Sequence, residues 1–149
     1  MKKIAIASII ALAAVSASAL EVGVTTSTSF AGADRAATGA TVGTSLAGFG
    51  VTAGVEKFTK GANDQTRWSL VADRALTTVG PVALSARAGV AFLDNQSSTD
   101  GYALVVGAGA SLPVTKQVSL DLGVARQYGQ KRVSGFDGNV ATLGLKYKF

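Results

Sequence analysis

The last nine residues of the chain, ATLGLKYKF at positions 141–149, alternate apolar and polar side chains without interruption. Successive side chains of a β-strand point to opposite sides of the sheet, so this period-two pattern predicts a strand with one apolar face. The apolar positions are Ala141, Leu143, Leu145, Tyr147 and Phe149. A helix would instead need apolar residues both three and four positions apart.

The same alternation recurs upstream and divides residues 20–149 into eight segments of about ten residues each. The connections alternate in length: short ones fall near 47–48, 77–80 and 113–116, and longer polar ones near 31–37, 59–64, 94–100 and 129–138. Short turns at one end and longer loops at the other are typical of outer-membrane barrels, whose turns lie in the periplasm. The predicted fold class is therefore all-β, an eight-stranded antiparallel up-and-down transmembrane β-barrel with both termini in the periplasm.

The first 19 residues have a different pattern, which is that of an export signal. Lys2 and Lys3 form a positively charged start, residues 4–15 are apolar, and residues 17–19 (Ala-Ser-Ala) match a cleavage site of small residues. The apolar run is shorter than the roughly 20 residues that a membrane-spanning helix needs. We therefore predict a cleaved signal peptide over 1–19 and a single barrel domain over 20–149.

The chain contains no cysteine and no histidine, which excludes disulfides, thiolate chemistry and a histidine base. Serines such as Ser27 and Ser119 therefore lack the histidine that would activate them as nucleophiles. The acidic loop over 94–100 lacks the spacing of a calcium-binding loop. We expect no enzyme activity, no cofactor and no metal site.

Charge gives little support for a polyanionic partner. The net charge of the chain is +5, and removal of Lys2 and Lys3 with the signal peptide lowers it by two. The remaining basic residues are dispersed along the chain, so we expect no binding to nucleic acid.

Alternation alone does not decide which face points outward, because a soluble lipocalin-like barrel also alternates, with its apolar face inside. The aromatic residues favour an outward apolar face, since they stand at strand ends as in the interfacial girdles of membrane barrels. Those predicted near the loop end are Phe30, Trp68, Phe92, Tyr102 and Tyr128, and those near the turn end are Phe49, Tyr147 and Phe149. The other face carries half of the 18 glycines, which suits the narrow interior of an eight-stranded barrel.

The predicted inner face also carries charged residues of both signs: Glu21, Glu56, Arg67, Asp73, Arg87, Asp121, Lys146 and Lys148. Buried charges are costly unless they are paired, so we expect an ion-pair network that plugs the interior. The expected pairs are Glu56 with Arg67, Asp73 with Arg87, and Glu21 with Lys146 or Lys148. The alternative is that some of these groups are hydrated and unpaired at the barrel ends.

Three basic residues, Lys57, Arg74 and Arg126, occupy outward positions. Lys57 and Arg126 fall near the loop end and Arg74 near the turn end, where long side chains can reach lipid phosphates. We expect Lys57 and Arg126 to contact lipopolysaccharide phosphates. Generic anchoring at the membrane interface explains the same positions equally well.

The segment LGLKYKF (143–149) resembles the terminal β-signal of bacterial outer-membrane proteins, with aromatic residues at the last and third-last positions. Together with the signal peptide and the strand count, it makes the chain similar to the small OmpA/OmpX or opacity-protein class of eight-stranded outer-membrane barrels. The resemblance implies transit with periplasmic chaperones and insertion by the barrel-assembly machinery, with Tyr147 and Phe149 as recognition residues. On the alternative reading, Phe149 is only a girdle residue.

The sequence leaves three functions open. We favour a structural or surface-interaction role in the Gram-negative cell envelope, for a monomer that contacts outer-membrane lipids and lipopolysaccharide. Porin-like passage or transport of small apolar solutes is the first alternative, although eight strands leave an interior filled by side chains. The second is an envelope lipid-modifying enzyme. The lipid A enzymes that this fold resembles rely on histidine, which the chain lacks.

Overall fold

The structure, a computed structural model, describes residues 19–30, 35–46, 48–60, 65–95, 101–129 and 137–149. The predicted signal peptide over 1–19, apart from its last residue, lies outside the described residues. Most of the four longer predicted connections also lie outside them. The signal peptide and its cleavage therefore stay predictions.

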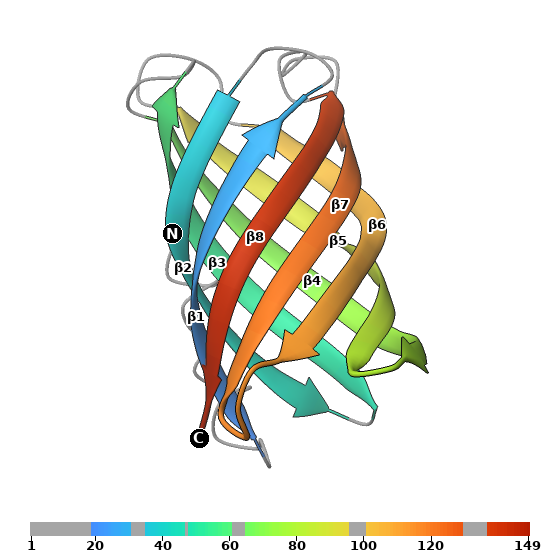
Figure 1. Cartoon of the computed structure of the whole chain (residues 1–149). Coiled ribbons are helices and arrows are strands. Elements are labelled where there is room, and N and C mark those ends of the chain that lie inside the picture. Colours follow the sequence, from blue (N-terminus) through green and yellow to red (C-terminus); the bar gives the residue numbers. More distant parts are fainter. Residues whose placement is uncertain (1–18, 31–34, 47, 61–64, 96–100, 130–136) are drawn as a thin grey trace.

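Eight strands form one closed sheet (Figure 1). They are β1 (Leu20–Ser29), β2 (Arg35–Leu46), β3 (Phe49–Lys60), β4 (Gln65–Val79), β5 (Val82–Asn95), β6 (Gly101–Pro113), β7 (Val118–Gly129) and β8 (Gly138–Lys148). Each strand is antiparallel to the next, and β8 pairs with β1 to close the barrel. The eight-stranded antiparallel barrel predicted from the alternation is confirmed.

Short turns join β2 to β3, β4 to β5 and β6 to β7 at the end of the barrel where the C-terminus lies (Figure 1). Gly48 and Gly80 have φ angles of +82° and +59°, which glycine adopts without steric cost. In the third turn, the Thr115 hydroxyl accepts hydrogen bonds from the N–H groups of Gln117 and Val118, at 3.2 and 2.9 Å. The second turn is tighter than predicted, because β4 continues through most of the segment over 77–80.

The strand register fixes the stagger of the sheet. We start at Leu20 on β1 and pass from each residue to the one directly opposite it on the next strand. After one circuit of the barrel this path returns to the first strand at Phe30, ten residues further along the chain. For eight strands spaced about 4.8 Å apart, a stagger of this size corresponds to a strand tilt of about 40°. The interior of such a barrel is only wide enough to be filled by side chains.

The two faces of the sheet differ sharply in exposure. The outward side chains of Val24, Leu104 and Val124 are all more than half exposed, whereas the inward Ala91 and Ala103 are at most 1% exposed. The apolar stripe therefore faces outward and the glycine-bearing stripe lines the interior, as the sequence predicts. Among the described residues, no helix has the length and apolar character needed to cross a membrane.

Candidate functional site: the barrel interior and its outer rim

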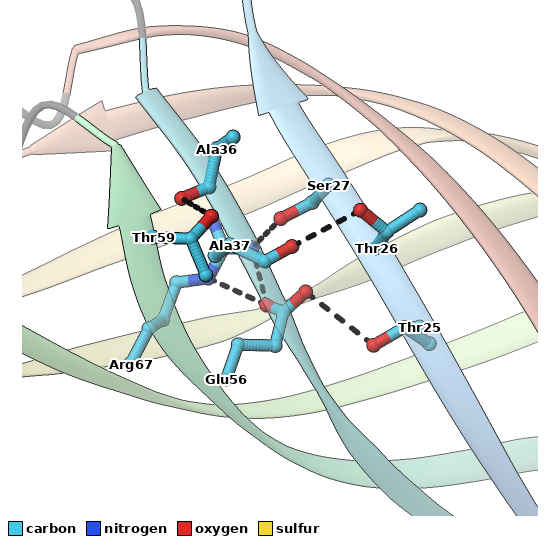
Figure 2. A network of polar contacts seen from close by, with 8 residues as sticks. All are labelled: Thr25, Thr26, Ser27, Ala36, Ala37, Glu56, Thr59 and Arg67. Carbon is cyan, nitrogen blue, oxygen red and sulfur yellow. Dashed lines mark hydrogen bonds and ion pairs between the residues drawn. The ribbon is translucent and has the colours of Figure 1, made fainter.

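The interior is bridged near the loop end by an ion pair between Glu56 and Arg67, which face each other on β3 and β4. The Arg67 Nε donates to Glu56 Oε2 at 2.8 Å, and Arg67 Nη2 donates both to the same oxygen and to Ser27 Oγ on β1 (Figure 2). The Thr25 hydroxyl donates to the other carboxylate oxygen, Oε1, at 3.4 Å. Both charged side chains are less than a tenth exposed, so the pair is buried and also hydrogen-bonded to β1.

On the loop side of this pair lies a small apolar cluster, which we call the apolar collar: Ala37, Phe58, Leu93 and Ala103. The Arg67 guanidinium carbon is 5.7 Å from the centre of the Phe58 ring, within the range of a cation–π contact. Phe58 is 6% exposed and follows Glu56 by two residues on the inner face of β3. The collar therefore covers the ion pair with apolar atoms.

Toward the turn end a second charged cluster crosses the interior. Asp121 on β7 is 6% exposed and forms ion pairs with Lys146 on β8 and with Arg87 on β5, whose Nη2 is 3.8 Å from Oδ2. The predicted pair of Asp73 with Arg87 is not among the ion pairs of the described residues. The two residues are opposed in the register of β4 and β5, but the guanidinium reaches Asp121 instead.

Glycines explain why Arg87 turns away from Asp73. A Cβ atom added at Gly109 would lie 2.2 Å from Arg87 Nε, and one at Gly123 would lie 2.6 Å from Arg87 Nη1. The side chain of Arg87 therefore lies along the wall formed by β6 and β7. A Cβ at Gly50 would lie 2.6 Å from Asp73 Oδ1, so the aspartate leans the other way, over β3. Asp73 and Arg87 thus point away from each other, because each side chain occupies the space left by a glycine on a neighbouring strand.

Glu21 is not brought into either of its predicted ion pairs within the described residues. Glu21 and Lys148 are opposed on β1 and β8 at the turn end, and Lys148 is exposed. Among the described residues no ion pair joins Glu21 to Lys146 or Lys148, and Lys146 binds Asp121. The structure therefore brings five of the eight predicted charges into ion pairs: Glu56, Arg67, Arg87, Asp121 and Lys146.

Two cavities within the described part of the barrel lie in its interior. One of about 130 Å³ lies between the two charged clusters, and hydroxyl side chains such as Thr25 and Ser69 line part of it. The other, of about 290 Å³, lies toward the turn end and is lined in part by Glu21 and Ser85. A water molecule needs only about 10–15 Å³ measured in this way, so both cavities have room for several waters. Phe58 lines neither of them.

The outer rim carries exposed cations at both ends. Near the loop end, the Arg126 guanidinium lies 5.8 Å from the Tyr128 ring centre and donates to Asn139 Oδ1 at 3.5 Å. Near the turn end, the Arg74 guanidinium lies 5.5 Å from the Phe49 ring centre. Lys57 is exposed on the outward face of β3, opposite Thr38 on β2 and Thr66 on β4.

The described residues contain no group of three or more His, Cys, Asp or Glu side chains that could hold a metal ion. Five of the predicted inner charges are instead paired with each other. The chemistry that the interior offers is therefore charge pairing and hydration.

Solved structures with the same architecture are small outer-membrane barrels. The N-terminal β-barrel domain of Pseudomonas aeruginosa OprF superposes with a TM-score of 0.72 and 19% identity, over 89% of this chain and 98% of that one. Neisserial surface protein A gives 0.57 and 22%, over 88% and 96% of the two chains. The Yersinia pestis outer membrane protein Ail gives 0.56 and 13%, over 88% and 99%.

This chain has the fold of the small eight-stranded outer-membrane barrels. No protein-family model and no curated protein sequence matches it, and the identities to the solved barrels are low enough that they carry the fold alone.

The residues of the predicted aromatic girdles lie on the outward face of the barrel. Seven of the eight residues have exposed side chains and Trp68 is half-buried; the seven are Phe30, Phe49, Phe92, Tyr102, Tyr128, Tyr147 and Phe149. Tyr147 and Phe149 pack edge to face, with ring centres 5.0 Å apart.

The apolar collar was missed by sequence reasoning, although a signal for it existed. Phe58 follows Glu56 by two residues, so period two places both side chains on the inner face. An aromatic residue on that face stands out against a background of glycine, serine and threonine. Its position next to Glu56 could have indicated that the ion pair is capped by apolar atoms.

Proposed function

We propose that this chain is a non-conducting barrel of the bacterial outer membrane, with a structural or surface-interaction role and both termini in the periplasm. The observation that carries the proposal is the buried Glu56–Arg67 pair with the apolar collar above it. The outward apolar stripe and the exposed aromatic residues at its ends support the location, since lipid is the environment that favours both.

A closed interior follows from the energetics of the ion pair. Taking one partner away from a buried pair costs about 3–5 kcal/mol, because the remaining charge has no compensation. An ion that crosses the barrel would have to separate Glu56 from Arg67 and displace the Phe58 ring. The side chains thus form a barrier rather than a selectivity filter.

Planar-bilayer conductance tests the proposal. The wild-type barrel is expected to give no stable unitary currents, whereas the double variant Phe58→Ala with Arg67→Ala should conduct, because the barrier is removed. The matched control is Lys148→Ala, which alters an exposed charge at the turn end and should leave the barrel silent. Stable unitary currents from the wild-type protein would contradict a closed interior.

Passage of small solutes is the second candidate, and the two cavities favour it. Together they extend from the ion pair to the turn end. Among the described residues, the Glu56–Arg67 pair and the apolar collar lie between these cavities and the loop end. Wild-type conductance would promote this candidate over the first.

The proposal includes assembly and lipid partners. Tyr147 and Phe149 serve as recognition residues for the barrel-assembly machinery after transit with periplasmic chaperones, and the folded protein is a monomer without enzymatic activity. Outer-membrane lipids and lipopolysaccharide surround it. Lipid A of unaltered composition after deletion of the protein is the expected result, and a changed lipid A would favour the enzyme.

A further inference from the structure

The outward apolar face is not equally long on all strands. On β6 six successive outward positions are apolar: Tyr102, Leu104, Val106, Ala108, Ala110 and Leu112. On β1 only Leu20, Val22 and Val24 are apolar, and the two outward positions nearer the loop end are Thr26 and Thr28. One side of the barrel therefore presents hydroxyl groups where the other side presents hydrocarbon.

These threonines belong to a continuous polar surface on β1–β4, which we call the hydroxyl patch: Thr26, Thr28, Thr38, Lys57, Thr59 and Thr66. The register opposes Thr26 to Thr38, Thr38 to Lys57, and Lys57 to Thr66. These four residues form one row across β1–β4, and Lys57 lies within that row between two threonines. All six side chains are exposed except Thr66, which is half-buried. Asp94, opposite Thr66 on β5, bounds the patch on that side.

Two of the hydroxyls are fixed by the barrel itself. The Thr26 Oγ1 donates to the Ala37 carbonyl oxygen and the Thr59 Oγ1 donates to the Ala36 carbonyl oxygen, each at 3.3 Å (Figure 2). Because their protons are used in these bonds, these oxygens are left as acceptors for an outside donor. Within the described part of the chain, Lys57 has no ion-pair partner, so its ammonium can bind an external anion.

We propose that the hydroxyl patch binds the headgroup of a phosphorylated glycolipid in the outer leaflet, an inference that rests on the proposed outer-membrane location. Lys57 binds a phosphate of that headgroup and the threonines exchange hydrogen bonds with its sugar hydroxyls. A phospholipid matches the patch less well, since it offers a phosphate for Lys57 but few hydroxyls for five threonines. Arg126 is different, because Asn139 and Tyr128 already hold its guanidinium.

The test uses the whole refolded barrel in phosphatidylcholine nanodiscs that contain lipid A, with bound lipid counted by native mass spectrometry. Lys57→Gln should weaken lipid A retention about tenfold, because a charge-assisted hydrogen bond is lost. Thr38→Val, which keeps the shape of the side chain, should weaken it about threefold through loss of a neutral hydrogen bond. Arg74→Gln is the matched control, since it removes an outward cation at the turn end and should change nothing.

Trp68 provides a second readout, since it is the single tryptophan and lies on the outward face two residues from Thr66. Its fluorescence should respond to lipid A in the wild type and much less in Lys57→Gln. Heat-modifiable gel mobility shows that each variant is folded before it is compared.

Three results would overturn the inference. Lys57→Gln could retain as much lipid A as the wild type, or the wild type could retain dephosphorylated lipid A equally well. The third is that phosphatidylglycerol binds as tightly as lipid A and that Thr38→Val does not weaken its binding. An equal loss in Arg126→Gln would also overturn it, because the interaction would then be generic to the rim. None of these results bears on conductance. A conducting wild type would remove the proposed function and leave lipid binding intact.

Discussion

Arg67 ties three strands together inside the barrel. From β4 it donates to Glu56 on β3 and to Ser27 on β1, and its guanidinium lies over Phe58. Arginine suits this place because its planar group carries five N–H donors in a fixed arrangement and stays charged. A lysine would place a single compact ammonium here and lose the planar arrangement of donors.

Replacing Arg67 with methionine should lower the free energy of unfolding by about 3–5 kcal/mol, because Glu56 is left buried without a counter-charge. Urea titration of the protein refolded in lipid vesicles measures this. The double variant Glu56→Gln with Arg67→Met should be more stable than Arg67→Met alone. If the single variant proves as stable as the double one, the pair does not act as a buried ion pair.

Gly109 tests the path of Arg87. Gly109→Ala should cost about 1–3 kcal/mol in the free energy of unfolding, as expected for an overpacked site, since its Cβ would meet Arg87 Nε at 2.2 Å. Gly43→Ala is the control, because its Cβ would approach no described atom closer than 3.1 Å. In an Arg87→Ala background the cost of Gly109→Ala should largely vanish. If Gly109→Ala is equally destabilising in the Arg87→Ala background, the added methyl group does not clash with Arg87.

At the scale of the strands, β8 is the element on which closure of the barrel depends. It pairs with β1 over nearly its whole length, and the Phe149 N–H donates to the Leu20 carbonyl oxygen at 3.0 Å. The last residue thus fixes the seam at the turn end, while its side chain stays 71% exposed. An exposed ring is free to be recognised during assembly.

Phe149→Ala should therefore separate folding from assembly. The purified variant is expected to refold in detergent, because the lost ring buries little surface, yet its yield in outer-membrane fractions should fall several-fold, as measured by quantitative immunoblot. Phe49→Ala, which removes an exposed girdle ring from β3, is the control and should assemble normally. Normal membrane yield of Phe149→Ala would leave Phe149 as a girdle residue only.

The strands could be predicted from sequence because their alternation has a period of two residues, which a barrel with unlike faces imposes directly. Strand ends were harder to predict. Residues 35–37 belong to β2 and residues 77–79 to β4, although both segments were predicted as connections. A register shift between Ala75 and Thr77 lets β4 pass the predicted turn, and such irregularities leave no clear mark in the alternation.

The pairing of charges was only partly predictable for a different reason. Glu56 and Arg67 pair as direct neighbours in the register, which strand order alone can suggest. Arg87 instead reaches across β6 to Asp121 on β7, because glycines on β6 and β7 leave room for its side chain. In so narrow an interior, the direction of a side chain depends on which residues of the neighbouring strands leave space for it. The alternation within one strand carries no information about that space.

At the scale of the whole molecule, a closed sheet both pairs the backbone groups and separates an apolar outer face from a polar inner face. Closure removes free strand edges, so backbone groups are paired within the barrel. The outward stripe is then free to be apolar and the inward stripe can hold water and charge. A barrel with an apolar outer surface is stabilised where that surface contacts hydrocarbon. The proposed membrane location therefore follows from the same alternation that gives the fold.

The most direct test is gel mobility of the protein extracted with detergent from outer-membrane fractions, compared before and after boiling. We expect the protein to need detergent for extraction and its mobility to change on boiling, because a closed barrel resists unfolding in cold detergent. A native protein recovered from the aqueous periplasm without detergent, with the same mobility before and after boiling, would contradict this expectation.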